Sequence, residues 1–389
     1  MTEAPATPVS FVAAALRLVR TDGVGPATYR RLLQRYLTPE AALEALPGLA
    51  RNAGRTVPAR SPSLTMAEDE IAALHQFGGR FLVLGTPDYP PLLAQIADAP
   101  PVLAVLGDPR ILHRRAVAMV GARNASAAGL RIAEALAAEL GGAGLLVVSG
   151  LARGIDAAAH RGAMHIGPTV AAIAGGLDRP YPPEHADLQA RIALTGCVVA
   201  ESPLGTVPTN RHFPRRNRII AGLSLGCVVV EAAMHSGSLI TANLALDYGR
   251  ELFSVPGSPL DPRSRGSNDL LRGRAHLTET AEDVLRELAQ LPADLGPDGF
   301  AEEPASPGSA WLSGWGAEAG EAWDQLDTVR AAVLQLLSHT PTPVDDLVRR
   351  CQFSVSAVLA VLTELELAGR IESHPGNRVG LLAHPLRSH

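Results

Sequence analysis

Short apolar runs alternate with longer stretches of helical periodicity between residues 81 and 288. Each run is four or five residues long and is followed by a glycine-rich or polar turn. Runs that are apolar throughout are typical of strands buried on both faces of a parallel sheet. The repeated strand–helix order therefore predicts an α/β fold with an extended Rossmann-like, doubly wound and mostly parallel sheet. The runs are Ala116–Val120, Leu145–Ser149, Val170–Ala174, Cys197–Ala200, Gly226–Val230 and Leu252–Val255.

Residues 10–50 follow a helical pattern instead, with apolar residues spaced as at Leu16 and Val19. Within this stretch lies Asp22–Pro26, whose two glycines allow a tight turn and whose proline suits the first position of the next helix. This pattern resembles a helix-hairpin-helix, which can present backbone N–H groups to phosphate. For a single hairpin we favour the alternative interpretation, a purely structural cap.

The C-terminal residues follow a third pattern. Helices are expected near Thr328–Leu337 and Val344–Cys351, and a third is expected from Ser354, a residue type that caps helix N-termini. The segment Arg370–Glu372 and a Gly376–Asn377 turn follow, so the tail resembles a helix-turn-helix with a β wing.

The outward face of the third C-terminal helix offers no basic residue to DNA. It carries Ser356, Ala360, Thr363 and Glu364, and Glu364 together with Glu366 would repel phosphate. A protein-interaction role or a weak accessory DNA role is therefore favoured for the tail over specific duplex recognition.

Four segments follow from these patterns. We expect an N-terminal helical SAM/helix-hairpin-helix-like domain with its linker, a Rossmann-like domain, a flexible linker rich in Pro, Gly, Ala and Glu, and a winged-helix domain. The corresponding residues are 1–64, 65–290, 291–324 and 325–389.

The charge balance limits the class of protein. A formal net charge of −5 excludes a uniformly basic nucleic-acid coat, so any DNA site must be a local concentration of charge. All 34 basic residues are arginine, because the chain has no lysine. GC-rich coding explains this usage, and arginine also suits bidentate contacts to phosphate.

Cysteine usage and apolar segments bear on the compartment. Three cysteines without metal-binding spacing indicate buried thiols in a reducing compartment. The N-terminus lacks a signal-peptide pattern, and no apolar run approaches the roughly 20 residues that span a bilayer. We therefore expect a cytoplasmic protein with no membrane partner.

The segment Phe213–Gly222 is the sharpest candidate site. No acidic residue occurs between Ser202 and Val230, although the protein as a whole is acidic. Arginine at a helix start opposes the helix dipole, so an anionic ligand is favoured over a merely solvated helix end whose arginines pair with remote carboxylates. The basic residues of this segment are Arg211, Arg215, Arg216 and Arg218.

Three other turns follow predicted strands, where ligands gather in parallel sheets. They contain Arg123, the Ser149–Gly150 pair, and the Ser236–Gly237–Ser238 run that opens a helix; the Gly175–Gly176 turn after a further strand is a fourth candidate. Glycine lets the backbone approach a phosphate, serine adds a hydroxyl, and a helix N-terminus adds partial positive charge. Together these turns predict a concave anion site.

Enzyme signatures are missing from the sequence. The turn at Gly121 lacks the dinucleotide fingerprint, no phosphate-binding lysine loop is possible without lysine, and no nucleophile elbow occurs at a strand end. Asp156 and His160 share a helical face and are interpreted as a hydrogen-bonded pair that braces the preceding loop. We therefore expect no catalytic residue, cofactor or metal.

Taken together, the motifs resemble the DNA-processing protein A (DprA/Smf) family between about residues 80 and 280. The matching segments are Asp88–Leu92, Pro100–Leu103, Val120–Arg123, Ser149–Asp156 with His160, Gly176–Asp178 with Tyr181–Pro182, Phe213–Gly222, Ser236–Ala242 and Val255–Gly257.

The resemblance implies a cytoplasmic, dimeric DNA-binding protein of natural transformation. Such proteins coat incoming single-stranded DNA and help to load the recombinase RecA onto it, and they are binding proteins rather than established enzymes. Carried over by motif, Arg123, Arg216, Asn217 and Arg218 would contact phosphate. Ser149, Gly150, Ser236, Gly237 and Ser238 would add backbone N–H and hydroxyl donors, with Arg211 and Arg215 nearby.

Two positions depart from the family pattern. Many relatives carry a basic residue after the Tyr-Pro segment, where this chain has Pro183–Glu184. Relatives commonly have Gly-Ala where this chain has Arg274–Ala275. The second change either rearranges a turn or extends the basic rim.

Two other functions stay open from sequence alone. One is a nucleotide-processing enzyme of the N-glycoside hydrolase type, which would need a carboxylate such as Glu231 or Asp156 beside the pocket. The other is an adaptor that recruits the recombinase through its tail and dimer surface, with DNA binding secondary.

Overall fold

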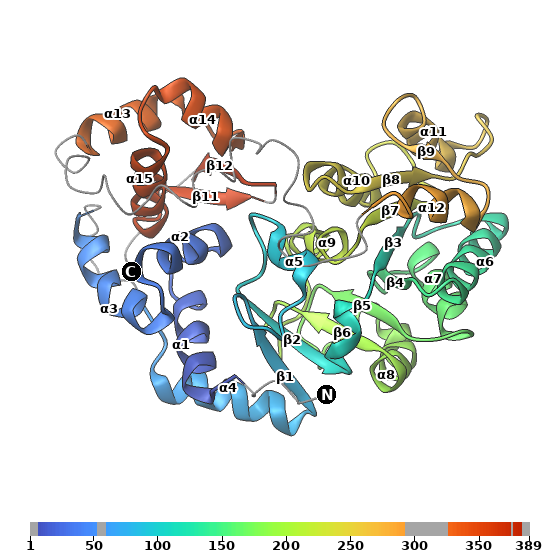
Figure 1. The fold of residues 1–389 in the computed structure, drawn as a ribbon, viewed down its shortest axis with the longest axis horizontal. Helices are drawn as coiled ribbons and strands as arrows, with labels where there is room; N and C mark the ends of the chain where they lie inside the picture. Colours follow the sequence, from blue (N-terminus) through green and yellow to red (C-terminus); the bar gives the residue numbers. More distant parts are fainter. Residues whose placement is uncertain (1–6, 53–59, 292–325, 375, 383–389) are drawn as a thin grey trace. The chain divides into compact units, whose positions relative to one another are not determined.

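The computed structural model describes residues 7–52, 60–291, 326–374 and 376–382. The chain forms two compact units, one from Met1–Glu68 with Phe300–His389 and the other from Asp69–Gly299 (Figure 1). The linker predicted for residues 291–324 lies outside the described residues, apart from Leu291. Residues 53–59, within the linker predicted after the N-terminal helices, also lie outside them.

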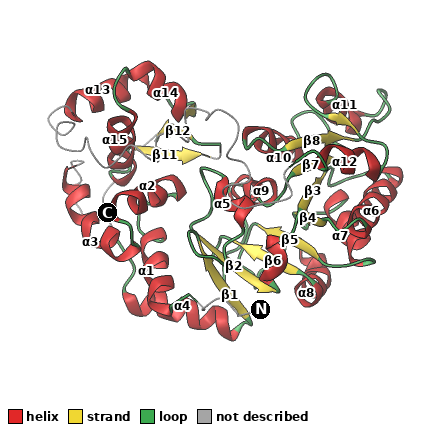
Figure 2. Cartoon of the chain, viewed as in Figure 1, coloured by secondary structure: helices red, strands yellow, loops and turns green. Residues whose placement is uncertain are grey.

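The second unit is built on a nine-stranded sheet with the order β1-β2-β6-β5-β4-β3-β7-β8-β9 (Figure 2). All pairs from β6 to β9 are parallel, which confirms the predicted mostly parallel sheet. The strands are β1 (Gly79–Val83), β2 (Val102–Gly107), β3 (Ala116–Val120), β4 (Leu146–Ser149), β5 (Thr169–Ile173), β6 (Cys197–Ala200), β7 (Gly226–Val229), β8 (Glu251–Ser254) and β9 (His276–Leu277).

The six apolar runs became β3 to β8, but three strands were not predicted. β1 and β2 are paired antiparallel at one end of the sheet, and β9 is a two-residue strand at the other end. The signal is weak for β1, which includes the exposed Arg80, and for β9, whose two residues are both exposed. β2 is an apolar run like those of β3 to β8 and was missed although its pattern is the same.

Helices cover both faces of the sheet, as a doubly wound fold requires. On one face, Ala118 and Val120 of β3 share a core with Ile219 of α9 and Ala242 of α10. On the other face, Met119 packs with α6, α7 and α12. The helices of this unit are α5 (Pro91–Gln95), α6 (Ala127–Gly142), α7 (Ile155–Met164), α8 (Ala186–Thr195), α9 (His212–Gly222), α10 (Gly237–Asp247), α11 (Arg265–Leu270) and α12 (Ala281–Leu288), and α4 (Leu64–Gln76) precedes β1.

The first unit contains the predicted N-terminal helices and winged helix. Its elements are α1 (Val9–Val19), α2 (Pro26–Tyr36), α3 (Pro39–Asn52), α13 (Leu326–Leu336), α14 (Val344–Cys351), α15 (Val355–Leu367), β10 (Thr342–Pro343), β11 (Ile371–His374) and β12 (Arg378–Leu381). The strands form an antiparallel sheet in the order β10-β12-β11. Pro26 begins α2 and Ser354 caps α15, as the sequence predicts.

The acidic face of α15 is buried, which corrects the expectation that it faces solvent. Glu364 pairs with Arg330 at 2.8 Å, and Glu366 accepts a hydrogen bond from Thr28. Burial raises the pKa of Glu366, whereas the nearby Arg31 lowers it. These carboxylates therefore stabilise the packing within the unit.

The glycine hairpin between α1 and α2 is covered by the end of α15. Gly23 has φ +84°, and a Cβ there would lie 2.8 Å from the carbonyl oxygen of Glu366. A hairpin covered in this way supports the interpretation of a structural cap. Among the described residues, no helix combines the length and apolar character that crossing a bilayer requires.

Candidate nucleic-acid interface

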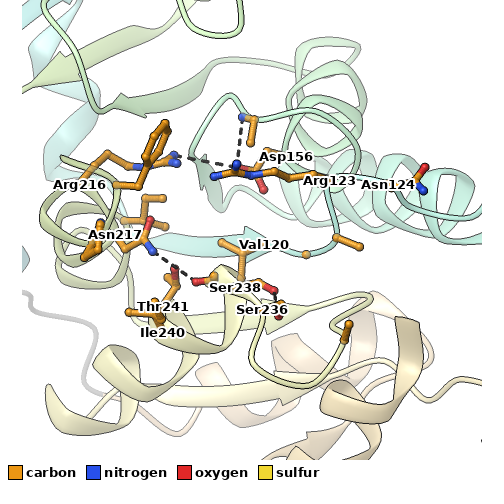
Figure 3. Close-up of a pocket in the computed structure, with 18 of the residues that line it drawn as sticks. Val120, Arg123, Asn124, Asp156, Arg216, Asn217, Ser236, Ser238, Ile240 and Thr241 are labelled. Atoms are coloured by element: carbon orange, nitrogen blue, oxygen red, sulfur yellow. Dashed lines mark hydrogen bonds and ion pairs between the residues drawn. The ribbon is translucent and has the colours of Figure 1, made fainter. Parts of the chain in front are cut away.

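A pocket of about 610 Å³ lies at the carboxyl ends of β3, β4 and β7 (Figure 3). From β3 the chain proceeds through β4, β5 and β6 in one direction across the sheet, and then through β7, β8 and β9 in the other. The pocket therefore lies at the topological switch point, where open α/β sheets bind their ligands because the loops diverge there. Its walls come from the turns after β3 and β4, the first half of α9 and the start of α10.

The start of α10 supplies neutral donors to the pocket. Ser236, Gly237 and Ser238 all line it, and the hydroxyls of the two serines lie 2.8 Å apart. Ser236 is the N-cap residue, but its side chain makes no capping hydrogen bond. The first N–H groups of α10 and the positive end of its dipole can therefore serve an anion in the pocket.

Arg123 is an exposed cation of the pocket, which Arg263, paired with Asp261, also lines. Arg123 follows β3, lines the pocket, and places its guanidinium 5.1 Å from the ring centre of Phe213. The Phe213 ring also contacts Tyr181, with 5.5 Å between ring centres. Sequence reasoning missed this aromatic pair, because the two residues are 32 positions apart and aromatic residues make up only 4% of the chain.

Arg216 also lines the pocket and is buried. Its Nη1 lies 4.0 Å from an Asp156 carboxylate oxygen and donates to the carbonyl of Ala172 at 3.2 Å. Burial lowers the pKa of Arg216 and raises the pKa of Asp156, while their mutual attraction opposes both shifts. The Nε of Arg216 is buried without a partner, so the guanidinium retains donor capacity.

Gly150 provides the space that Arg216 occupies. A Cβ at Gly150 would lie 1.4 Å from the Arg216 Nη1 and 2.7 Å from an Asp156 oxygen. The residue therefore acts through this close approach and not as a pocket donor. Ser149 is buried and donates its hydroxyl to the carbonyl of Met119 at 2.6 Å, so its side chain does not face the pocket.

Arg218 lies outside the pocket, which does not fit the expected phosphate contact. It is buried, pairs with Glu201 at 2.6 Å, and lies 3.9 Å from Asp98. Burial lowers the pKa of Arg218, but the two carboxylates raise this pKa by more than burial lowers it, so the net shift is upward. Arg218 therefore follows the alternative interpretation, in which an arginine of this segment pairs with remote carboxylates.

The remaining residues of the α9 segment divide into two groups. Asn217 lines the pocket and donates to the carbonyl of Gly237 at 3.4 Å, which joins α9 to α10. Arg211 and Arg215 are exposed at the start of α9, beside the pocket lining. Arg274, outside this segment, does not line the pocket and lies 3.8 Å from Asp269.

The predicted Asp156–His160 hydrogen bond is wrong. Asp156 accepts from the backbone N–H of Ala152 at 3.3 Å and so does brace the loop after β4. His160 instead contacts the Thr169 hydroxyl at 2.9 Å, and burial lowers its pKa to about 3. Among the described residues, no group of His, Cys, Asp and Glu could hold a metal ion.

The family models and the curated relatives agree on one family. Residues 80–289 match the family described as DNA recombination-mediator protein A, residues 317–377 match the DprA winged helix domain, and residues 12–73 match the DprA-like N-terminal HHH domain. Protein Smf of Synechocystis sp. is 32% identical over 384 residues, which covers 92% of this chain and 96% of that protein.

Two further relatives extend the comparison. Protein Smf of Escherichia coli is 37% identical over 319 residues, covering 81% of this chain and 80% of that protein. The solved structure of DNA processing protein A from Streptococcus pneumoniae superimposes with a TM-score of 0.60 at 34% identity. It covers 72% of this chain and 98% of that one.

Gly150→Ala should displace Arg216, because the new methyl group would overlap the guanidinium. The expected result is a loss of about 1–3 kcal/mol in the free energy of unfolding, measured by urea denaturation. Gly237→Ala is the matched control, since a Cβ there has nothing within 4 Å. Equal stability of the two variants would contradict the placement of Arg216.

His160 should make the second unit sensitive to acid. Its pKa is about 3 in the folded protein and about 6.5 in the unfolded chain, so the unfolded state binds the extra proton and stability falls as pH falls below about 6.5. Between pH 7 and pH 5 this loss should reach about 2 kcal/mol. His160→Gln should remove that part of the pH dependence in urea titrations, and an unchanged slope would refute the assignment.

Proposed function

This chain belongs to the DNA recombination-mediator protein A (DprA) family, and from that premise we propose that it is a DNA-processing protein of natural transformation that binds single-stranded DNA. The observation that carries this proposal is the convergence of an exposed arginine, Arg123, and the open N-terminus of α10 on one pocket at the switch point of the sheet. Both features attract phosphate, and neither reads a base.

The dimensions of the pocket favour a single strand. A volume of about 610 Å³ suits one nucleotide unit, whereas a duplex presents its phosphates on a wide, rigid cylinder. The donors are backbone N–H groups, hydroxyls and a guanidinium, so binding should be independent of sequence. The Phe213–Tyr181 pair at the pocket adds an apolar surface for an unstacked base.

We also propose that the protein is not an enzyme, because the two candidate carboxylates, Glu231 and Asp156, both have structural partners. Glu231 accepts from the backbone N–H of Ser126 at 2.9 Å and from its hydroxyl at 2.5 Å. Asp156 is buried between Arg216 and the loop after β4. Both groups therefore have structural partners, which favours binding over N-glycoside hydrolysis.

Cellular role and assembly form the second part of the proposal. We infer a cytoplasmic homodimer that delivers the bound strand to the recombinase RecA. Membership of the family supports this role, and β9, at the edge of the sheet with Leu277 half exposed, is a candidate surface for a second copy. The acidic α15 packs within its own unit, so it does not support the tail as a DNA-reading element.

Binding should depend on salt through the exposed arginines. Arg123, Arg211 and Arg215 can neutralise about three phosphates, so log affinity should fall with log salt at a slope of about −2. Arg123→Ala should weaken binding to all sequences about equally and reduce the slope by about 0.7. Fluorescence anisotropy with single- and double-stranded DNA measures both quantities.

Arg286→Ala is the control for this measurement, because Arg286 is an exposed arginine of α12 outside the pocket lining. A flat salt response, or an Arg123→Ala variant that binds as the wild type does, would overturn the proposal. Arg216→Ala is the poorer probe: it leaves Asp156 buried without its partner, which costs about 3–5 kcal/mol of stability.

RecA loading should depend on the same pocket. We expect wild-type protein to accelerate RecA filament formation on single-stranded DNA, and Arg123→Ala to lose this effect in proportion to its loss of DNA affinity. Filament formation is followed by RecA ATP hydrolysis on coated strands. Full loading activity in a variant that no longer binds DNA would favour the adaptor role instead.

A further inference from the structure

An exposed ion pair lies at the edge of the pocket, between two loops that follow neighbouring strands. Arg153, in the loop after β4, donates from its Nε to the Glu184 carboxylate. Their side chains are 63% and 48% exposed, so both can reach solvent or a ligand. The pairing raises the pKa of Arg153 and lowers the pKa of Glu184, which means that both are charged at neutral pH.

The backbone places Arg153 beside the Arg123 turn. Gly154, the next residue, packs so closely on that turn that a Cβ would lie 2.1 Å from the Ala122 carbonyl oxygen and 2.7 Å from that of Arg123. On its other side, Ala152 lines the pocket. Arg153 therefore continues the basic edge of the pocket beyond Arg123.

Glu184 is held next to this edge by the turn after β5. The turn forms a short 3-10 segment, Pro183–His185, and the His185 ring nitrogen Nδ1 lies 2.9 Å from the carbonyl oxygen of Leu151. Tyr181, in the same turn, contacts Phe213, which lines the pocket. The ion pair and the aromatic pair thus border the pocket together.

We propose that Arg153 is a phosphate-binding residue and that the Glu184 carboxylate competes with the DNA backbone for it. This inference rests on the proposed function. A strand that leaves the pocket past Arg123 would bring its next phosphate to Arg153, where it must replace the Glu184 carboxylate. The guanidinium of arginine can donate two parallel hydrogen bonds to a phosphate, as it can to a carboxylate, so the exchange needs no rearrangement of the backbone.

The exchange is feasible because the pair is exposed. An exposed ion pair is weakly held, since water and salt screen it, so a backbone phosphate that is already positioned by the pocket can displace the carboxylate. Glu184 then acts as a determinant of affinity, because it neutralises the one cation, Arg153, that the next phosphate would contact. The departure at Pro183–Glu184 thereby changes the strength of the site and leaves its architecture intact.

The test is a mutant cycle on the full chain. Wild type, Glu184→Gln, Arg153→Gln and the double variant are titrated with a fluorescently labelled mixed-sequence single strand at several salt concentrations. Glu184→Gln should bind about threefold more tightly. Arg153→Gln should bind more weakly than wild type and reduce the salt slope by about 0.7. In the Arg153→Gln background, Glu184→Gln should give no gain.

Glu287→Gln is the matched control. Glu287 is an acidic residue of α12 that pairs with Arg286, and the neighbouring Leu288 carbonyl accepts from Arg115, just before the amino end of β3. This control therefore removes the same charge at the edge of the sheet opposite the pocket, and it should bind as wild type does.

The inference is overturned if Glu184→Gln binds no more tightly than Glu287→Gln, if Arg153→Gln binds as wild type does, or if the gain persists without Arg153. Arg123→Ala, measured alongside, separates this failure from that of the proposed function. Loss of affinity in Arg123→Ala without any effect at Arg153 and Glu184 would retain the pocket and reject only its extension.

Discussion

The pocket depends on one buried ion pair, between Arg216 of α9 and Asp156 of α7. The two helices lie on opposite faces of the sheet, and the pair joins them across the carboxyl ends of the strands at the switch point. Such a pair is costly to bury unless further hydrogen bonds satisfy it. Here the Ala172 carbonyl and the Ala152 N–H provide them, and Gly150 gives the space that brings the groups together.

The basic residues around the pocket have two different roles: some stabilise its walls and others are exposed to a ligand. Arg216 and Arg218 are both buried and both neutralised, one by Asp156 and the other by Glu201 and Asp98. Exposed positive charge at the pocket comes from residues such as Arg123, Arg263 and the first turn of α9. A protein with a net charge of −5 can in this way keep a local anion site, because its buried arginines fix the walls and its exposed ones act on the ligand.

The first unit uses acidic residues for packing in a comparable way. Glu364 and Glu366 of α15 are buried against Arg330, Thr28 and Arg31. In winged-helix proteins this helix would read DNA, but here its acidic side chains make contacts within the unit. The end of the same helix covers the glycine hairpin. Neither motif can be assigned a nucleic-acid role from its sequence pattern alone.

The sequence by itself determined the α/β class, β3 to β8, the helix starts at Pro26 and Ser354, and the turns that meet at the pocket. These features depend on local patterns: apolar runs, helix-capping residues, and strand ends that a parallel sheet must bring to one edge. Only the tertiary structure decided which arginines are buried in ion pairs and which are exposed to a ligand. Arg215, Arg216 and Arg218 are near neighbours on one helix, yet only Arg215 is exposed, because the sheet and remote carboxylates such as Asp156 and Glu201 cover the other two. Those partners are 17 to 60 residues away in the chain, so no local pattern could identify them.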